Sequence, residues 1–429
     1  MSDRVPGWYR VAWFLGRAPA LSTSQWRLLG LVAAVSVFEQ YDIYLFALNL
    51  KQIQADLSIP ESQLGLLGAV VRAGSFLAVV LAIAADRWGR RALLLFTVLG
   101  YTLFTGATAF SPNAELFVVF QFFARGFASA EVMIAAVVIA EEFPPENRGW
   151  GIGALAALQA CGAGLAALLF GFVESIPYGW RTLYFIGLIP LLFIAYWRRT
   201  LPETKRFENV REARQSEPVF RPLLELFSQS PRRMIALFSA VFFFSLGASS
   251  ASFFAPKYLQ DVYLWTPASV AILNFVGGGL AIIGNPLAGW LSDRFGRRPV
   301  TCIFAASFTF MGIIFYSAIG VFVPLLWIGL IFFVMGSDVT LSAYGTELFP
   351  TKYRSTATGF RGFMGTIASI MGLSAVSGLF LIFDSNWISI AVLCGMCIVV
   401  PLIVWLFLPE TAGRTLEEIS PDEVASPQV

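Results

Sequence analysis

Seven ionisable residues lie inside long apolar runs, where a charge needs a physical reason. Each such residue would cost roughly 2.5–3.5 kcal/mol near the centre of a bilayer, so seven unpaired side chains facing lipid would cost on the order of 20 kcal/mol. We therefore expect them to face the protein interior, mostly in pairs. Any one pair could be a structural link between helices, but buried pairs are weak stabilisers, so the set points to transport. The seven residues are Glu39, Asp42, Arg72, Arg125, Glu131, Asp338 and Arg361.

Glu39 and Asp42 are spaced for proton chemistry. They are three residues apart in the stretch FEQYDIYLF, which puts both on one face of a helix. Burial disfavours a charged carboxylate and a nearby guanidinium favours it, so a pair that separates during a conformational change can take up and release a proton. Because the chain contains no histidine, carboxylates are the plausible proton carriers. We assign Asp42 as the proton site and Glu39 as the second choice.

The charges in the apolar runs leave the sign of a solute open. Arg72, Arg125 and Arg361 offer forked donors that suit a carboxylate, whereas the acids Glu131 and Asp338 would attract a cation. Aromatic side chains near these charges favour a small ring-bearing or amphiphilic solute over a polyol, although most aromatics in such helices simply pack. The aromatic residues that we place in the solute site are Tyr44, Phe243, Phe253 and Tyr344.

The elements that must position these residues are long apolar helices. Of 429 residues, 57% are hydrophobic and 13% are charged, which excludes an ordinary soluble protein. A spanning helix needs about 20 apolar residues, and these runs are too long and too uniform for the alternating strands of an outer-membrane barrel. We predict an all-α membrane protein with twelve transmembrane helices, near residues 28–50, 64–85, 92–110, 116–140, 150–173, 182–200, 234–256, 268–291, 300–319, 324–346, 357–383 and 387–408.

The basic residues predict the orientation of these helices. Of the 29 lysines and arginines, 23 fall in the N-terminus, the even-numbered loops and the C-terminus, and only Lys51, Arg181 and Lys257 fall in the other loops. The positive-inside rule then predicts that both termini are cytoplasmic. The net charge of +2 reflects this topology, so we expect no nucleic-acid partner.

The second half of the chain repeats the first. DRWGRR begins at Asp86 and DRFGRR begins 207 positions later at Asp293, and Trp180 and Trp387 are separated by the same offset. The PET sequence also recurs at this distance, which indicates two six-helix halves. The predicted segments are a cytoplasmic N-terminal segment (1–27), an N-terminal six-helix bundle (28–200), a cytoplasmic linker (201–233), a C-terminal six-helix bundle (234–408) and a cytoplasmic tail (409–429).

The paired D-R-x-G-R-R motif, in a twelve-span chain with a long central loop, resembles the major facilitator superfamily over nearly the whole chain. Within that superfamily, EEFPPENRG and the two PET sequences are similar to the sugar porters. ELFPTKYRSTATGF is more similar to the organic-ion branch, which includes niacin and synaptic-vesicle-glycoprotein-like carriers. The resemblance implies alternating access, in which two bundles rock around a central cavity.

Departures from the sugar-porter pattern disfavour a hexose. The paired glutamine expected in the seventh helix is replaced by FFFSLGASSASFF, and the Gly-Pro-x-x-Trp-like run expected in the tenth helix is replaced by VMGSDVTLSAYG. The Gly-Pro-x-x-Gly-Gly pattern of drug/proton antiporters is also missing from the fifth helix, LAALQACGAGLAALLFG. Gln159 matches a sugar-porter binding glutamine, keeps sugars possible and joins the expected solute-binding residues.

The same resemblance implies a partner for the proton site. Asp42 matches the aspartate in the first helix of proton-coupled sugar porters, and Arg125 in FFARGF matches the arginine in the fourth helix that partners it. Arg125 therefore completes the expected proton-coupling group. The alternative is that Asp42 is a permanently ionised partner of Arg125.

The resemblance also implies a cytoplasmic gate built from the repeated loop motifs. In the family, the motif aspartate at a helix end is held by helix-dipole and arginine contacts. Exposed ion pairs are individually weak, but a network that forms in one state and breaks in the other can bias a two-state balance. The alternative is that the arginines only set topology. The implied gate residues are Asp86, Arg90, Arg91, Glu141, Arg148, Asp293, Arg297, Arg298, Glu347 and Arg354.

Together these observations predict a proton-coupled symporter for a small organic solute, more specifically an organic anion such as an aromatic or heterocyclic carboxylate. The alternatives are a sugar/proton symporter, an organic-cation carrier, an exporter and a transporter-like receptor that binds without transport. We expect no enzyme activity, metal or cofactor, because no run carries a nucleophile with a base and no lysine completes a phosphate-binding loop. We expect a monomer in the plasma (inner) membrane whose partners are the solute, protons and the lipid bilayer.

Overall fold

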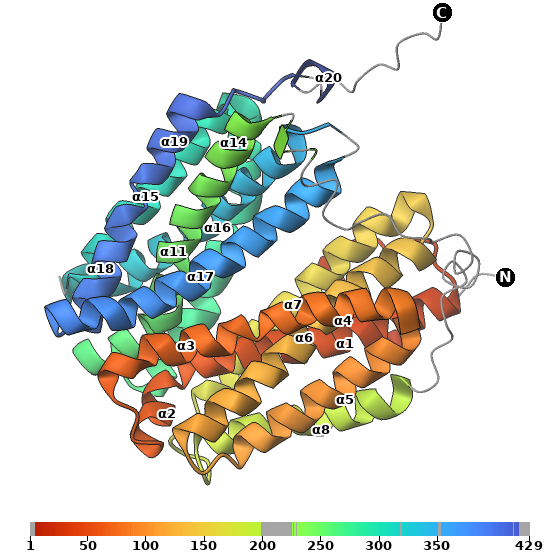
Figure 1. The fold of residues 1–429 in the computed structure, drawn as a ribbon. Coiled ribbons are helices and arrows are strands. Elements are labelled where there is room, and N and C mark those ends of the chain that lie inside the picture. The colour runs from red at the N-terminus through yellow and green to blue at the C-terminus, as the bar shows by residue number, and fades with distance from the viewer. Residues whose placement is uncertain are drawn as a thin grey trace, which may run out of the picture. The chain divides into compact units, whose positions relative to one another are not determined.

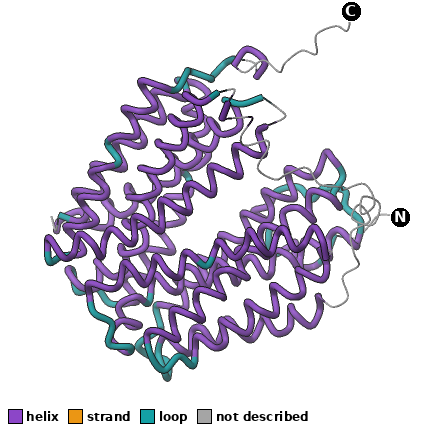
Figure 2. Tube along the Cα trace, in the orientation of Figure 1, coloured by secondary structure: helices purple, strands orange, loops and turns teal. Residues whose placement is uncertain are grey.

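The computed structural model describes residues 5–88, 90–198, 225, 227–228, 230–317, 320–350, 353–414 and 416–419. Within these residues the regular structure is helical and no strand occurs (Figure 2). Eleven of the described helical segments are long and apolar enough to cross a membrane, and the shorter apolar helix Trp180–Ile194 takes the place of the predicted sixth span. The predicted all-α membrane architecture is therefore confirmed.

The chain forms two compact units. Unit 1 comprises Met1–Ile59, Val70–Gln215 and Trp265–Ile272, and unit 2 comprises Pro60–Ala69, Ser216–Leu264 and Leu273–Val429. Two short segments therefore depart from chain order. Residues 60–69 belong to the first half in sequence but pack in unit 2, and residues 265–272 belong to the second half but pack in unit 1.

Unit 1 holds the N-terminal segment and most of the first six spans, coloured red to yellow-green in Figure 1. The helix α3 begins in unit 2 and ends in unit 1. The elements are η1 (Gly7–Arg10), η2 (Trp13–Leu15), α1 (Thr23–Leu48), α2 (Leu50–Asp56), α3 (Leu64–Ala73), α4 (Ser75–Trp88), α5 (Arg90–Ala109), α6 (Ala114–Glu142), η4 (Pro145–Asn147), α7 (Arg148–Phe170), α8 (Trp180–Arg198) and α12 (Pro267–Ile272).

Unit 2 holds most of the second six spans, coloured green to blue in Figure 1. Its eighth and twelfth spans are each built from several consecutive helical pieces. The elements are η3 (Glu61–Gln63), α11 (Pro231–Val262), η5 (Leu273–Gly277), α13 (Gly278–Ile282), α14 (Gly284–Phe295), α15 (Arg297–Tyr316), η6 (Gly320–Phe322), α16 (Val323–Glu347), α17 (Arg354–Phe383), α18 (Asn386–Met396), α19 (Val399–Phe407) and α20 (Leu416–Ile419).

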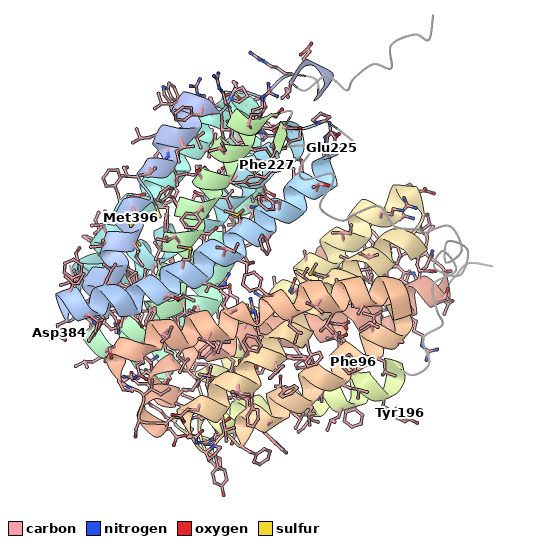
Figure 3. All side chains as sticks on the ribbon, viewed as in Figure 1. Phe96, Tyr196, Glu225, Phe227, Asp384 and Met396 are labelled. Carbon is pink, nitrogen blue, oxygen red and sulfur yellow. The ribbon has the colours of Figure 1, made fainter. Side chains whose placement is uncertain are left out.

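Large apolar side chains cover the outer surfaces of both units. Phe96 on α5 and Tyr196 on α8 point outward from unit 1, and Met396 on α18 points outward from unit 2 (Figure 3). Such side chains recur along α4, α8, α14 and α19. An apolar surface of this extent is unfavourable in water and favourable against lipid hydrocarbon. The chain is therefore an integral membrane protein.

Two glycines bring the helices of unit 1 close together. A side chain at Gly74, between α3 and α4, would run into the carbonyl oxygen of Phe122 on α6. A side chain at Gly162 on α7 would run into the carbonyl oxygen of Val37 on α1. Small residues allow this close backbone approach between membrane helices. The two crossings set the spacing of the helices that carry the charged residues of unit 1.

Candidate functional site

The two acids of α1 are buried inside unit 1. Glu39 is 5% exposed and Asp42 is 6% exposed. The rotation of α1 is held by two hydrogen bonds between helices: the Tyr41 hydroxyl donates to a carbonyl oxygen of α8 at 2.7 Å, and the Tyr101 hydroxyl of α5 donates to the Phe38 carbonyl oxygen at 2.7 Å. These bonds keep the face that carries both carboxylates turned into the bundle.

Arg125 on α6 supplies the positive charge that acts most strongly on both carboxylates. Its Nε donates to the Ser75 Oγ of α4 at 3.2 Å, close to the crossing at Gly74. In the described part of the chain, neither Glu39 nor Asp42 lies within 4 Å of its guanidinium. Arg125 therefore acts on both carboxylates from a distance, without a direct ion pair among the described residues.

The oxygens of the two acids have different surroundings. The Gln159 Nε2 of α7 donates to the Glu39 Oε2 at 3.3 Å, because the crossing at Gly162 holds α7 against α1. Gln121 and Thr105 lie beside Asp42, but its buried Oδ1 has no hydrogen-bond partner among the described residues. A buried, charged oxygen without a donor is costly. The two acids therefore differ in the hydrogen bonds that their oxygens receive.

Arg72 lies in the last turn of α3 and is half-buried. Within the described ranges its guanidinium forms no hydrogen bond and no ion pair. The charged group that acts on it most strongly is another arginine, Arg125. Arg125 is acted on by Glu39 and Asp42, whereas Arg72 has no acidic partner in the described ranges. The Arg72 guanidinium is therefore suited to an anion, because it presents several N–H donors.

Two of the expected solute-binding residues are completely buried. Glu131 is completely buried on α6, where it accepts a hydrogen bond from the Thr97 Oγ1 of α5 at 2.8 Å. Tyr344 on α16 is also completely buried, and the charges that act on it include those of Glu410 and Glu347. We therefore leave both side chains out of the proposed solute site.

Two of the seven ionisable residues form an ion pair in unit 2. The Arg361 Nη1 of α17 lies 3.0 Å from the Asp338 Oδ1 of α16, with the Asp338 side chain 60% exposed and the Arg361 side chain 17% exposed. The buried Arg361 Nε has no acceptor among the residues described. The ion pair with Asp338 therefore leaves one N–H of Arg361 available to a further acceptor.

Three of the expected aromatic residues are half-buried: Phe243 and Phe253 on α11 of unit 2, and Tyr44 on α1 of unit 1.

Three of the implied gate residues form a network within unit 2. The Arg297 Nη2 lies 2.7 Å from the Asp293 Oδ1 and 2.8 Å from the Glu347 Oε1. The Arg298 guanidinium lies over the Trp405 ring, 4.7 Å from its centroid. These contacts join the ends of α14, α15, α16 and α19.

Glu410 completes this network, although the sequence analysis did not single it out. Its Oε1 accepts from the backbone N–H of Arg297 at 2.7 Å and its Oε2 from that of Arg298 at 3.1 Å, which caps the N-terminus of α15. The neighbouring Thr411 Oγ1 donates to the Glu347 Oε2 at 2.6 Å. The signal in the sequence was the recurrence of the PET motif.

The structure describes the side chains of only some of the other gate residues. The side chains of Asp86, Arg90, Arg91 and Glu141 lie outside the described part of the structure. The Arg148 Nε donates to the Phe143 carbonyl oxygen at 3.2 Å. In unit 2, the buried Arg354 Nε has no acceptor among the described residues.

The sequence analysis also missed a buried lysine that forms two ion pairs. Lys257 on α11 is 2% exposed and forms ion pairs with Asp261 and, at 2.8 Å, with the Glu61 Oε1. The Asn386 Nδ2 of α18 donates to the Glu61 Oε2 at 3.1 Å. The predicted span ended at residue 256, one position before Lys257, whereas α11 continues to Val262. Lys257 therefore counted only as a loop charge.

The sequence profile of the Major Facilitator Superfamily matches residues 31–373. The chain is 25% identical to a probable 4-methylmuconolactone transporter of Cupriavidus pinatubonensis over 97% of both chains. It is 27% identical to a cis,cis-muconate transport protein of Acinetobacter baylyi, over 79% of this chain and 84% of the relative.

Solved structures of the same fold agree with this match. The crystal structure of a D-xylose-proton symporter superimposes with a TM-score of 0.74 at 19% identity, covering 90% of this chain and 98% of the symporter. At this identity the likeness concerns the fold. The family match covers most of the chain and the relatives are transporters, so this protein is a transporter and belongs to the Major Facilitator Superfamily.

Proposed function

We propose that the protein imports a small organic anion, an aromatic or heterocyclic carboxylate, together with protons. The observation that carries this proposal is the environment of Arg72. Its guanidinium has no acidic partner in the described part of the chain, and the charge that acts on it most strongly is that of Arg125. A carboxylate at this position would accept hydrogen bonds from Arg72 and relieve the repulsion between the two cations.

The two acids that would favour a cation already have partners within the protein. Asp338 is paired with Arg361 at 3.0 Å, and Glu131 is completely buried beside Thr97. Gln159, the residue that keeps a sugar possible, donates its amide N–H to Glu39. The available polar groups therefore favour an anion over a cation or a sugar.

The names of two relatives support an unsaturated organic solute. One is named for transport of 4-methylmuconolactone and another for transport of cis,cis-muconate, an organic anion. Within unit 1, the half-buried Tyr44 adds apolar surface suited to a ring or a conjugated chain. We therefore favour a carboxylate attached to a flat, unsaturated group.

Asp42 carries the proton in this proposal. Its Oδ1 is buried and has no donor among the described residues, and Arg125 attracts the carboxylate from beyond contact distance. Movement of Arg125 toward or away from Asp42 would then change the affinity of Asp42 for a proton. Glu39 is the second candidate, because Gln159 already holds one of its oxygens.

The proposal places the protein in the plasma (inner) membrane as a monomer with both termini in the cytoplasm. Transport then follows the alternating access that is common in this superfamily. The network of Arg297, Asp293 and Glu347 serves as the cytoplasmic gate. It acts by forming in one state of the cycle and breaking in the other.

Ligand binding to purified protein tests the role of Arg72. Benzoate, nicotinate and cis,cis-muconate are compared with benzamide by calorimetry and by the melting temperature. We expect at least one carboxylate to bind and the amide not to bind. Loss of charge-assisted hydrogen bonds should weaken carboxylate binding about 10- to 100-fold in Arg72→Ala, with partial recovery in Arg72→Lys.

The matched control is Arg414→Ala, which removes an exposed arginine near the C-terminus and should leave binding unchanged. Equal affinity for carboxylate in wild type and in Arg72→Ala would contradict the proposal. Tighter binding of benzamide than of benzoate would contradict it as well.

A further inference from the structure

We infer that residues 5–22, which we name the N-terminal clasp, form a binding surface for anionic lipid headgroups at the leaflet where α1 begins. The clasp precedes residue 31, where the match to the family begins. It takes no part in the solute site described above. The inference therefore does not depend on the proposed function.

The clasp packs against unit 1 through four aromatic rings, those of Trp8, Tyr9, Trp26 and Trp150. Tyr9 is buried, and its ring lies 5.1 Å from that of Trp26 on α1 and 6.2 Å from that of Trp150 on α7. The Trp8 ring lies 5.9 Å from the Trp26 ring, edge to face. Such ring pairs each add to the energy of burial. The clasp is therefore a packed element of the unit and has a defined outer face.

Hydrogen bonds fix the same segment along its length. The Tyr9 hydroxyl donates to the Gly16 carbonyl oxygen at 3.0 Å, which closes the segment into a loop. The Trp150 Nε1 donates to the Leu15 carbonyl oxygen at 3.4 Å. The Ser22 side chain then caps α1 by accepting from the Gln25 N–H at 3.3 Å. The loop is held to α1 and α7 from both ends.

The clasp lies beside the first turns of α1. A side chain at Gly30 would meet the Trp8 Nε1 at 3.3 Å. Gly30 is seven residues after Thr23, the first residue of α1. Trp8 therefore lies about 10 Å from the start of α1, measured along the helix axis. The headgroup region adjoining the hydrocarbon core is about 5–8 Å thick on each side. Because the predicted first span begins near residue 28, Gly30 marks the edge of the hydrocarbon core, and we place the clasp at its boundary with the headgroups.

The outer face of the clasp combines apolar and basic side chains. Val11 is 80% exposed and Phe14 is 46% exposed, and both would be unfavourable in water. Arg10 and Arg17, on either side of them, are exposed as well. Apolar side chains that enter the boundary between headgroups and acyl chains, flanked by arginines, are typical of segments that bind anionic membrane surfaces. The matching occupant is an anionic phospholipid.

The test uses the full-length protein with an environment-sensitive fluorescent amino acid at position 11. The protein is reconstituted in nanodiscs of phosphatidylcholine alone or mixed with phosphatidylglycerol, with and without doxyl-labelled lipid. We expect a blue shift and quenching by the doxyl lipid at position 11. The same probe at Arg414, an exposed position after α19, should stay in water and unquenched.

Headgroup selectivity is measured by titrating detergent-solubilised protein with short-chain phosphatidylglycerol or phosphatidylcholine. We expect the anionic lipid to bind on the order of tenfold more tightly, and this preference to disappear in Arg10→Gln/Arg17→Gln. Arg10→Lys/Arg17→Lys should retain it, which separates loss of charge from misfolding. A probe at position 11 that remains in water would overturn the inference, as would equal binding of both lipids or an unchanged preference in the glutamine variant.

Discussion

At the scale of the residue, two carboxylates on one helix face have different neighbours. Glu39 and Asp42 share a helix face and are almost equally buried. Gln159 holds an oxygen of Glu39, whereas the Asp42 Oδ1 has no donor in the described part of the chain. The acid whose oxygen lacks a donor has more to gain from a proton. The two acids should therefore respond differently to loss of their charge.

We expect Asp42→Asn to abolish accumulation of solute driven by a pH gradient in proteoliposomes. An amide cannot exchange a proton in the physiological range, so transport loses its link to the gradient while the anion site remains. Exchange of internal for external solute should continue and should lose its dependence on pH. Glu39→Gln is the comparison and should keep gradient-driven uptake in part. Full accumulation by Asp42→Asn would refute the assignment of the proton site.

At the scale of the element, close helix crossings place the polar groups. Gly162 allows α7 to approach α1, whereas Gly153 on the same helix has open space around it. Alanine favours a helix by about 1 kcal/mol over glycine, and overpacking costs about 1–3 kcal/mol. We expect Gly162→Ala to lower the melting temperature in detergent and Gly153→Ala to leave it unchanged or raise it. An equal effect of the two substitutions would show that the crossing is not tight.

A second prediction for an element concerns the surroundings of Lys257 on α11. The Asp261 side chain is 22% exposed and that of Glu61 is 42% exposed, so solvent screens the second ion pair more. Asp261→Asn should destabilise unit 2 by about 1–3 kcal/mol, because it leaves a buried ammonium less compensated. Glu61→Gln should cost about 1 kcal/mol or less. Thermal unfolding of both variants in one detergent gives the order, and the reverse order would contradict the difference in screening.

At the scale of the whole molecule, the topology can be tested from the two faces of the membrane. Tyr178, between α7 and α8, is 85% exposed, and Glu146, between α6 and α7, is also exposed. In a Cys161→Ser background, a membrane-impermeant maleimide should label Tyr178→Cys in intact cells and Glu146→Cys only after permeabilisation. The distribution of basic residues gives this expectation. The opposite labelling pattern would invert the proposed orientation.

Two short segments pack in the unit formed mainly by the other half of the chain, and this was not predicted from the sequence. Residues 60–69 follow the first span and have the composition of an ordinary helix start, yet they pack in unit 2. The Leu66 N–H donates to the Ser377 Oγ of α17 at 2.9 Å, and Glu61 contacts Lys257. The partners lie about 200–300 positions away in the chain, and the predicted spans carry no information about pairing at that distance.

The sequence by itself determined the class of protein, the number of spans and the internal repeat. These follow from local properties, since a bilayer requires each segment to be apolar over its own length and to satisfy its own backbone. Only the tertiary structure decided which charges have partners. Arg125 is the charge that acts most strongly on Arg72, Glu131 accepts from Thr97, and the Asp42 Oδ1 has no donor among the residues described, because the rotation and spacing of the helices select each neighbour. Those quantities depend on crossings such as those at Gly74 and Gly162, where contact between distant backbones fixes what a single helix leaves open.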